Sequence, residues 1–155
     1  FVNTHPSEKL CTGLLENLRE IRDRFPARPL TIEIHEAAVT DLDEMQQFRA
    51  VLEELNIGLA YDDFGAGQAR LLDLIEVPPD YLKFDIKLIR DIHRHPQQQQ
   101  MVESLVGMVR DFGIAALAEG IECREEAEVC QRLGFDLAQG YLYGRPMLVD
   151  SIPVA

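Results

Sequence analysis

Short apolar runs rich in β-prone residues recur along the chain, and a longer amphipathic segment of helical period follows each of them. This alternation is typical of βα units around a parallel sheet. It predicts an α/β fold with strands near residues 1–3, 30–34, 57–62, 81–85, 114–119 and 136–143, and with helices near 7–24, 41–55, 68–76, 97–112 and 124–133.

Local signals mark the ends of several predicted elements. Asp41 suits a helix N-cap, and Gly113 and Gly134 suit helix C-terminal stops. The run HRHPQQQQ (93–100) reads as a loop entering a helix whose first turns are rich in glutamine. Because no Gly/Ser-rich or Pro-rich linker divides the chain, we expect one domain over residues 1–155.

Composition narrows the class of protein. With 155 residues, 46% of them apolar and 27% charged, the chain suits a globular unit with its own core. It contains neither a run of about 18 apolar residues nor a basic-then-apolar signal at its start, so we expect a cytoplasmic protein. Three cysteines without a C-x-x-C pair suggest ordinary reduced thiols.

The net charge of −12 argues against binding a nucleic acid polymer, because such binding needs clustered Lys and Arg to neutralise phosphates. An anionic ligand would therefore need metal ions to supply the positive charge.

Polar residues gather where the predicted strands end. In a parallel α/β barrel the carboxyl ends of the strands carry the active site, so one site is expected there. A complete barrel has eight strands and about 250 residues, and we therefore expect this chain to be the C-terminal part of a longer domain. The residues concerned are Glu33, Asp62, Asp63, Lys83, Asp85, Glu119 and Gln139.

These side chains suit divalent cations. Carboxylates with the Asn3 carbonyl form an oxygen-only donor set, which favours Mg²⁺ or Mn²⁺. Adjacent aspartates such as Asp62 and Asp63 can serve two ions, the arrangement that phosphodiester hydrolysis uses. Lys83 could orient a water or steady phosphate charge, and Glu119 could accept a proton or bind metal. The alternative is structural, since an Asp-Asp pair at a strand end often caps a helix.

The turn after the aspartates contains Gly65 and Gly67, which permit unusual dihedral angles and a loop that closes over substrate.

Six stretches of the chain resemble the EAL domain, the cyclic di-GMP phosphodiesterase of bacterial signalling, in order and in spacing. DDFGAG, AEGIE and QGYLYGRP in series are the most specific. The stretches are VNTHP (2–6), EIHE (33–36), DDFGAG (62–67), KFD (83–85), AEGIE (118–122) and QGYLYGRP (139–146).

The resemblance implies a modified (β/α)8 TIM-barrel fold, here truncated to about six βα units, that hydrolyses cyclic di-GMP to linear pGpG with two Mg²⁺ or Mn²⁺ ions. The resemblance also implies a homodimer. It implies a longer parent protein with sensory or diguanylate cyclase-like domains upstream, and a segment outside this chain could tether that parent to a membrane. By motif position the implied metal ligands are Asn3, Glu33, Asp62 and Asp63; Lys83 holds the catalytic water, Glu119 is the base or a metal ligand, and Gln139, Glu122, Glu36 and Asp85 are substrate-binding or supporting residues.

The chain departs from the family pattern in several places. It begins after the expected position of the Glu-Ala-Leu motif, which carries a metal ligand, so this chain alone could be inactive. His35 stands where the family usually has Thr, and shares a strand face with Glu33 but not with Glu36. Gln68, Ala69 and Arg70 replace the usual aromatic-Ser-Ser, and Asn3 lies near the terminus.

Three functions stay open on these residues. The first is a cyclic di-GMP phosphodiesterase, and the second is a binding module that keeps the nucleotide pocket without catalysis. The third is a barrel enzyme of another two-metal class. The first is favoured because every catalytic position present in the chain carries the expected residue type.

Overall fold

A single all-parallel sheet with its strands in sequence order organises the protein. The computed structural model describes residues 1–4, 12–35, 42–66 and 72–147. The sheet confirms the predicted α/β class and fits a barrel truncated to six βα units. Its strands are β1 (Val2–Asn3), β2 (Thr31–His35), β3 (Gly58–Phe64), β4 (Tyr81–Phe84), β5 (Ala115–Ala118) and β6 (Leu137–Ala138).

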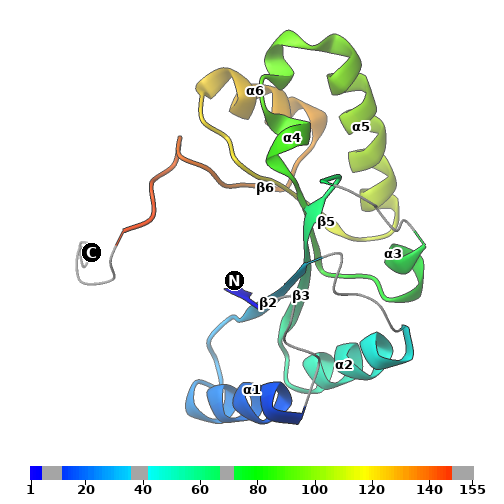
Figure 1. Ribbon diagram of the computed structural model, residues 1–155, viewed down its shortest axis with the longest axis vertical. Coiled ribbons are helices and arrows are strands. Elements are labelled where there is room, and N and C mark those ends of the chain that lie inside the picture. The colour runs from blue at the N-terminus through cyan, green and yellow to red at the C-terminus, as the bar shows by residue number, and fades with distance from the viewer. Residues whose placement is uncertain (5–11, 36–41, 67–71, 148–155) are drawn as a thin grey trace.

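Helices connect successive strands and form an arc around the sheet, whereas β1, at the amino end of the chain, lies toward the open side of that arc (Figure 1). The short helix α4 and the 3-10 helix η2 were not predicted, because four and three residues are too few to show a helical period. The helices are α1 (Thr12–Arg24), α2 (Leu42–Glu54), α3 (Asp73–Glu76), α4 (Ile86–Ile89), η2 (Ile92–Arg94), α5 (Pro96–Asp111) and α6 (Arg124–Leu133).

Most predicted element ends are confirmed. Gly113 follows α5 and Gly134 caps α6, both with positive φ. The glutamine run lies in the first turns of α5, as expected, but His93 and Arg94 before it form the 3-10 helix η2 rather than a loop. β6 is shorter than predicted, because the chain leaves the sheet after Ala138. Asp41 lies outside the described residues.

The main core lies between the sheet and its helices. Because side chains alternate across a strand, every second residue faces the helices. Tyr61 and Phe84 on that face are buried and belong to one apolar cluster with residues of α2 and α5. Larger members of this core are Ile32, Ile34, Met45, Phe48, Leu52, Leu59, Leu82, Val102, Val106 and Val109. The opposite face carries Glu33 and Lys83, and this leaves it free to form a polar site.

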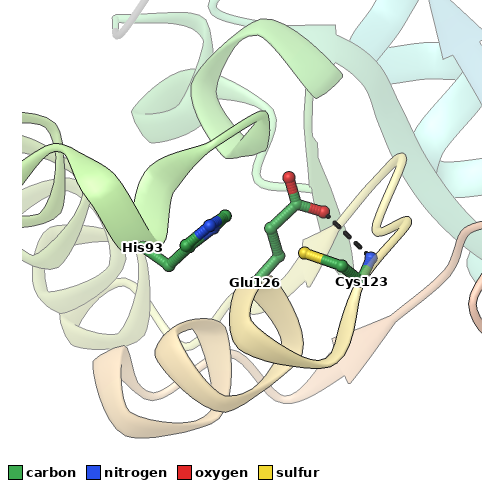
Figure 2. A group of neighbouring side chains, drawn as sticks. All are labelled: His93, Cys123 and Glu126. Atoms are coloured by element: carbon green, nitrogen blue, oxygen red, sulfur yellow. Dashed lines mark hydrogen bonds between the residues drawn. The ribbon is translucent and has the colours of Figure 1, made fainter.

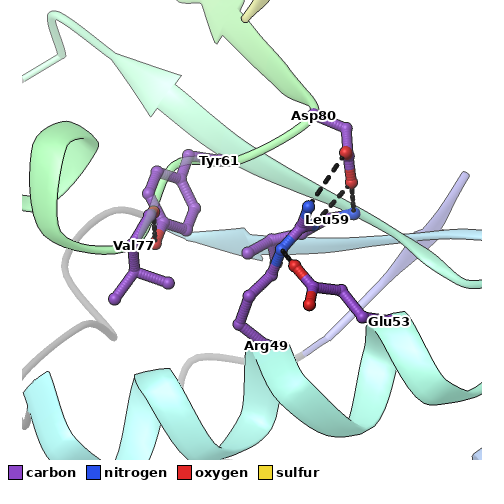
Figure 3. A network of polar contacts seen from close by, with 6 residues as sticks. All are labelled: Arg49, Glu53, Leu59, Tyr61, Val77 and Asp80. Atoms are coloured by element: carbon purple, nitrogen blue, oxygen red, sulfur yellow. Dashed lines mark hydrogen bonds and ion pairs between the residues drawn. The ribbon is translucent and has the colours of Figure 1, made fainter. Parts of the chain in front are cut away.

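An ion-pair network joins α2 to the amino ends of two strands (Figure 3). Nη1 and Nη2 of Arg49 donate to the Asp80 carboxylate at 2.6 and 3.1 Å, and Nε donates to Glu53 at 2.9 Å. Asp80 also accepts from the Leu59 amide at 2.8 Å. The network therefore fixes the amino ends of β3 and β4, the end of a barrel associated with stability.

None of the helices in the described ranges is long and apolar enough to cross a membrane. Cys123 and Cys130 are free thiols, as expected, and Cys11 lies outside the described residues. Cytoplasmic location stays a prediction.

Candidate functional site

The Lys83 ammonium lies at the centre of a cluster of carboxylates. Its Nζ is 2.9 Å from Oε1 of Glu33, Oδ1 of Asp62 and Oε1 of Glu119. The lysine side chain is only 4% exposed. Glu33, Asp62 and Lys83 lie on three neighbouring strands, and Glu119 directly follows β5. The fold thus brings together four of the residues selected from the sequence, and we call these four residues the Lys83 cluster.

Strand pairing explains why these residues meet. Lys83 of β4 pairs with Leu117 of β5, so Glu119 emerges just beyond the paired residues. The other neighbour, β3, has an irregular register here: Tyr61 pairs with Leu82, but Phe64 pairs with Phe84. Two residues of β3 therefore oppose one residue of β4, which is the pattern of a β-bulge.

The bulge lets two consecutive carboxylates face one site. In a regular strand Asp62 and Asp63 would point to opposite faces. Instead Asp63 has φ 62°, a left-handed conformation that costs a residue other than glycine about 1–2 kcal/mol. Carboxylate oxygens of Asp62, Asp63 and Glu119 all lie within 4.8 Å of one another. This strained backbone therefore concentrates negative charge.

Gly65 has φ 90° in the turn that follows the bulge, as its position predicted, and Gly67 lies outside the described residues. A Cβ on Gly65 would lie 2.4 Å from a methyl carbon of Leu88, so a larger residue there would have to displace the Leu88 side chain.

The charges in the cluster do not balance. Counting Asp63, four carboxylates surround a single ammonium group, which leaves an excess of negative charge. Burial by itself would lower the pKa of Lys83. The hydrogen bonds to Glu119, Asp62 and Glu33 outweigh this effect and raise the pKa above its usual value, so the lysine is protonated. Burial, with the charge of Asp62, raises the pKa of Glu119 to about 7 in spite of Lys83. Crowded oxygen donors with excess charge fit divalent cations.

His35 completes the side of the cluster next to Asp63. Its Nε2 is 3.0 Å from Oδ2 of Asp63, and both side chains are 38% exposed. His35 pairs in register with Asp62 across β2 and β3, so the two side chains lie on the same face of the sheet. Glu33 lies two residues before His35 on the same strand and therefore shares this face. The departure from the family's Thr therefore places an imidazole against a predicted metal ligand.

Gln139 extends the cluster beyond Glu119. Its Nε2 donates a hydrogen bond to Oε1 of Glu119. The adjacent Gly140 allows this approach, because a Cβ there would lie 2.2 Å from the carbonyl oxygen of Ile121. The backbone of Ile121 also pairs with Gln139 and Leu142. The glycine of the QGY sequence is thus required by a close approach of two chain segments.

Glu122 and Asp85 bind partners outside the Lys83 cluster. Glu122 forms a two-pronged ion pair with Arg90, whose Nη2 is 2.8 Å from Oε1 and whose Nη1 contacts Oε2. Asp85 caps α4 by accepting from the Lys87 amide at 2.9 Å. Their roles toward substrate stay predictions, and Glu36 lies outside the described residues.

Asn3 lies on β1 in register with Glu33, and therefore on the same face of the sheet. Its exposed position at the edge contrasts with the next residue, Thr4, which is buried. Thr4 donates from both Oγ1 and its amide to the Glu33 carbonyl, at 2.8 and 3.0 Å. This pairing holds β1 against the strand that carries Glu33, and the role of Asn3 as a ligand stays a prediction.

Sequence reasoning missed two features near the site: the ion pair of Arg90 with Glu122, and the contact of His35 with Asp63. Arg90 falls in the unpredicted segment around α4, so no strand end marked it. The His35 contact depends on the bulge, which leaves no periodic signal.

The chain matches the EAL domain family over residues 1–146. It is 32% identical to the cyclic di-GMP phosphodiesterase RocR of Pseudomonas aeruginosa over 94% of this chain, but spans only 38% of the length of RocR. That residues 1–155 form a single domain, the C-terminal part of a longer barrel, stays a prediction.

Solved structures give the same result. The cyclic di-GMP complex of the MucR phosphodiesterase of Pseudomonas aeruginosa has a TM-score of 0.86 and 30% identity, with 96% of this chain and 68% of that chain covered. The manganese and cyclic di-GMP complex of Klebsiella pneumoniae BlrP1 has a TM-score of 0.82 and 36% identity, with 93% and 38% covered. With the family match over 146 residues, these likenesses establish that the chain belongs to the EAL domain family.

Proposed function

We propose that this chain is the catalytic part of a cyclic di-GMP phosphodiesterase, which uses divalent cations to hydrolyse one phosphodiester bond and release linear pGpG. The observation that carries the proposal is the buried Lys83 ammonium held by three carboxylates at the carboxyl ends of the strands. The names of the relatives support it, since RocR is a cyclic di-GMP phosphodiesterase.

The donor set fits two divalent ions. Asp62 and Asp63 supply adjacent carboxylates, Glu33 a buried one and Asn3 an amide oxygen, while Glu119 is close enough to share an ion. Oxygen-only donors suit Mg²⁺ or Mn²⁺, and BlrP1 binds manganese with cyclic di-GMP. When bound, such ions attract the phosphate and acidify water. We propose either Mg²⁺ or Mn²⁺ as the ion that serves this protein.

The residues of the cluster divide the remaining work. Glu119, with a pKa of about 7, can take the proton of the attacking water near neutral pH. Lys83 aligns the Glu119 carboxylate and can donate to the water or to a phosphate oxygen. As the water adds to phosphorus, one P–O bond breaks and its oxygen takes up a proton. Gln139 holds Glu119 from the other side.

The assay is Mn²⁺-dependent turnover of cyclic di-GMP with chromatography of the products. Because the chain spans 38% of RocR, it is run on the chain and on the longest open reading frame that contains it. Asp62→Asn should abolish turnover and leave the circular dichroism spectrum unchanged, since one charge of a predicted ligand is lost. Near-normal turnover in this variant would refute the site.

A second outcome separates function from fold. Binding of cyclic di-GMP without turnover in the longer chain would point to a receptor, and neither binding nor turnover would leave only the family relationship. Dimerisation and upstream sensory or diguanylate cyclase-like domains are also proposals; MucR, named as a bifunctional cyclase and phosphodiesterase, gives a precedent for the latter.

A further inference from the structure

A second group of metal-binding side chains lies outside the Lys83 cluster, where α6 begins. A ring nitrogen of His93, the Sγ of Cys123 and a carboxylate oxygen of Glu126 all lie within 4.8 Å of one another. His93 comes from η2, whereas the other two come from the first turn of α6 and its cap. Figure 2 shows the three side chains converging on one space.

His93 contributes an unpaired nitrogen. Its Nδ1 is buried and has no hydrogen-bond partner within the described part of the chain. Buried polar atoms in folded proteins are nearly always paired, so this nitrogen needs a partner that the described residues do not provide. An imidazole nitrogen is also the commonest protein ligand for transition metals.

Cys123 occupies a position where cysteine is a poor choice for capping. It is the N-cap of α6, and its side chain accepts from the N3 amide in a capping box with Glu126. Serine and threonine normally fill this position, because a hydroxyl accepts far better than a thiol. A cysteine therefore weakens the cap, but it adds a soft metal ligand.

Glu126 adds a buried negative charge. The residue is 2% exposed, and its carboxylate accepts from the amides of Asp91 at 2.8 Å, Glu122 at 2.9 Å and Cys123 at 3.4 Å. Burial raises its pKa, but these hydrogen bonds lower it below the usual value, so the group stays ionised. Among the described residues no cationic side chain forms an ion pair with it, and a buried charge favours a counter-ion.

We propose that His93, Cys123 and Glu126 bind a Zn²⁺ ion, with the fourth coordination position open to water. Nitrogen, sulfur and oxygen donors together suit zinc, with bond lengths of about 2.0–2.3 Å. Binding releases the thiol proton to solvent, and small side-chain rotations bring the three ligand atoms onto the ion. The ion joins η2 to α6 and so braces the segment that carries Glu119 and Glu122.

The test uses Co²⁺ in place of zinc, because a cobalt–thiolate bond gives a charge-transfer absorption band that an oxygen-donor site cannot give. Titration of the wild-type chain should produce this band, and its final intensity should correspond to one thiolate-bound cobalt per chain, because cobalt bound at the Lys83 cluster does not contribute to it. Cys123→Thr and His93→Gln should abolish it, whereas the matched controls Cys130→Ser, Cys11→Ser and His95→Gln should retain it.

Cys123→Thr also separates metal binding from folding. Threonine caps a helix well, so the metal-free variant should unfold at or above the wild-type temperature while lacking the band. Absence of the band in the wild type, or its persistence in Cys123→Thr, would overturn the zinc site. Neither result bears on hydrolysis, because the Lys83 cluster contains no thiol.

Discussion

Replacing Lys83 by methionine should destabilise the metal-free protein severely, because it removes the ammonium from three carboxylates and nearly keeps the side-chain volume. Each charge-assisted hydrogen bond is worth about 1.5–3 kcal/mol net, but the three do not add, since the carboxylates can take up protons and relax. Removing one partner of a buried ion pair costs about 3–5 kcal/mol. We therefore expect the free energy of unfolding to fall by about 3–5 kcal/mol at pH 7. This is a large share of the roughly 5–15 kcal/mol by which a folded domain is stabilised.

The assay is urea unfolding followed by circular dichroism in EDTA, with Lys87→Met as the matched control. Within the described residues the Lys87 ammonium makes one long exposed contact, 3.4 Å from the Ala66 carbonyl oxygen, so its loss should change the unfolding free energy by at most about 0.5 kcal/mol. Lower pH should narrow the gap between Lys83→Met and wild type, since protonated carboxylates no longer need a cation. Added Mn²⁺ should also restore part of the loss. A Lys83→Met variant within about 1 kcal/mol of wild type at pH 7 would refute the central role of this ammonium.

Two further predictions concern Glu119 and Gly140. The folded pKa of Glu119 is raised from 4.5 to about 7, so the folded state binds its proton more tightly and this group's stabilising contribution is lost as pH rises through that window. In EDTA, the unfolding free energy of Glu119→Gln minus that of wild type should therefore increase between about pH 4.5 and 7; a flat or falling difference would contradict the shift. Gly140→Ala should lower the free energy of unfolding by more than about 1 kcal/mol, and with it the melting temperature, because a Cβ would lie 2.2 Å from backbone. The control Gly107→Ala, at a helix position with nothing within 4 Å, should raise the free energy of unfolding by up to about 1 kcal/mol. Equal shifts in the two variants would show that the close approach at Gly140 does not matter.

The periodic pattern was sufficient to predict the α/β class, six strands and most helices, because long buried faces leave a repeat in the sequence. It also placed Glu33, Lys83 and Glu119 at the carboxyl ends of strands, where parallel pairing had to bring them together. The residue types predicted oxygen ligands and a cation.

Contacts that depend on three-dimensional packing left no such signal. The sequence showed two adjacent aspartates, but only the bulge, with Asp63 in a left-handed conformation, turns both carboxylates to one site. The Arg90–Glu122 pair joins residues 32 positions apart through a helix too short to show a period. Likewise, His93 and Cys123 meet only because η2 packs against the start of α6. The sequence therefore determined which groups stand at the strand ends, whereas register and packing between distant segments decided which of them touch, because those contacts join residues far apart in the chain.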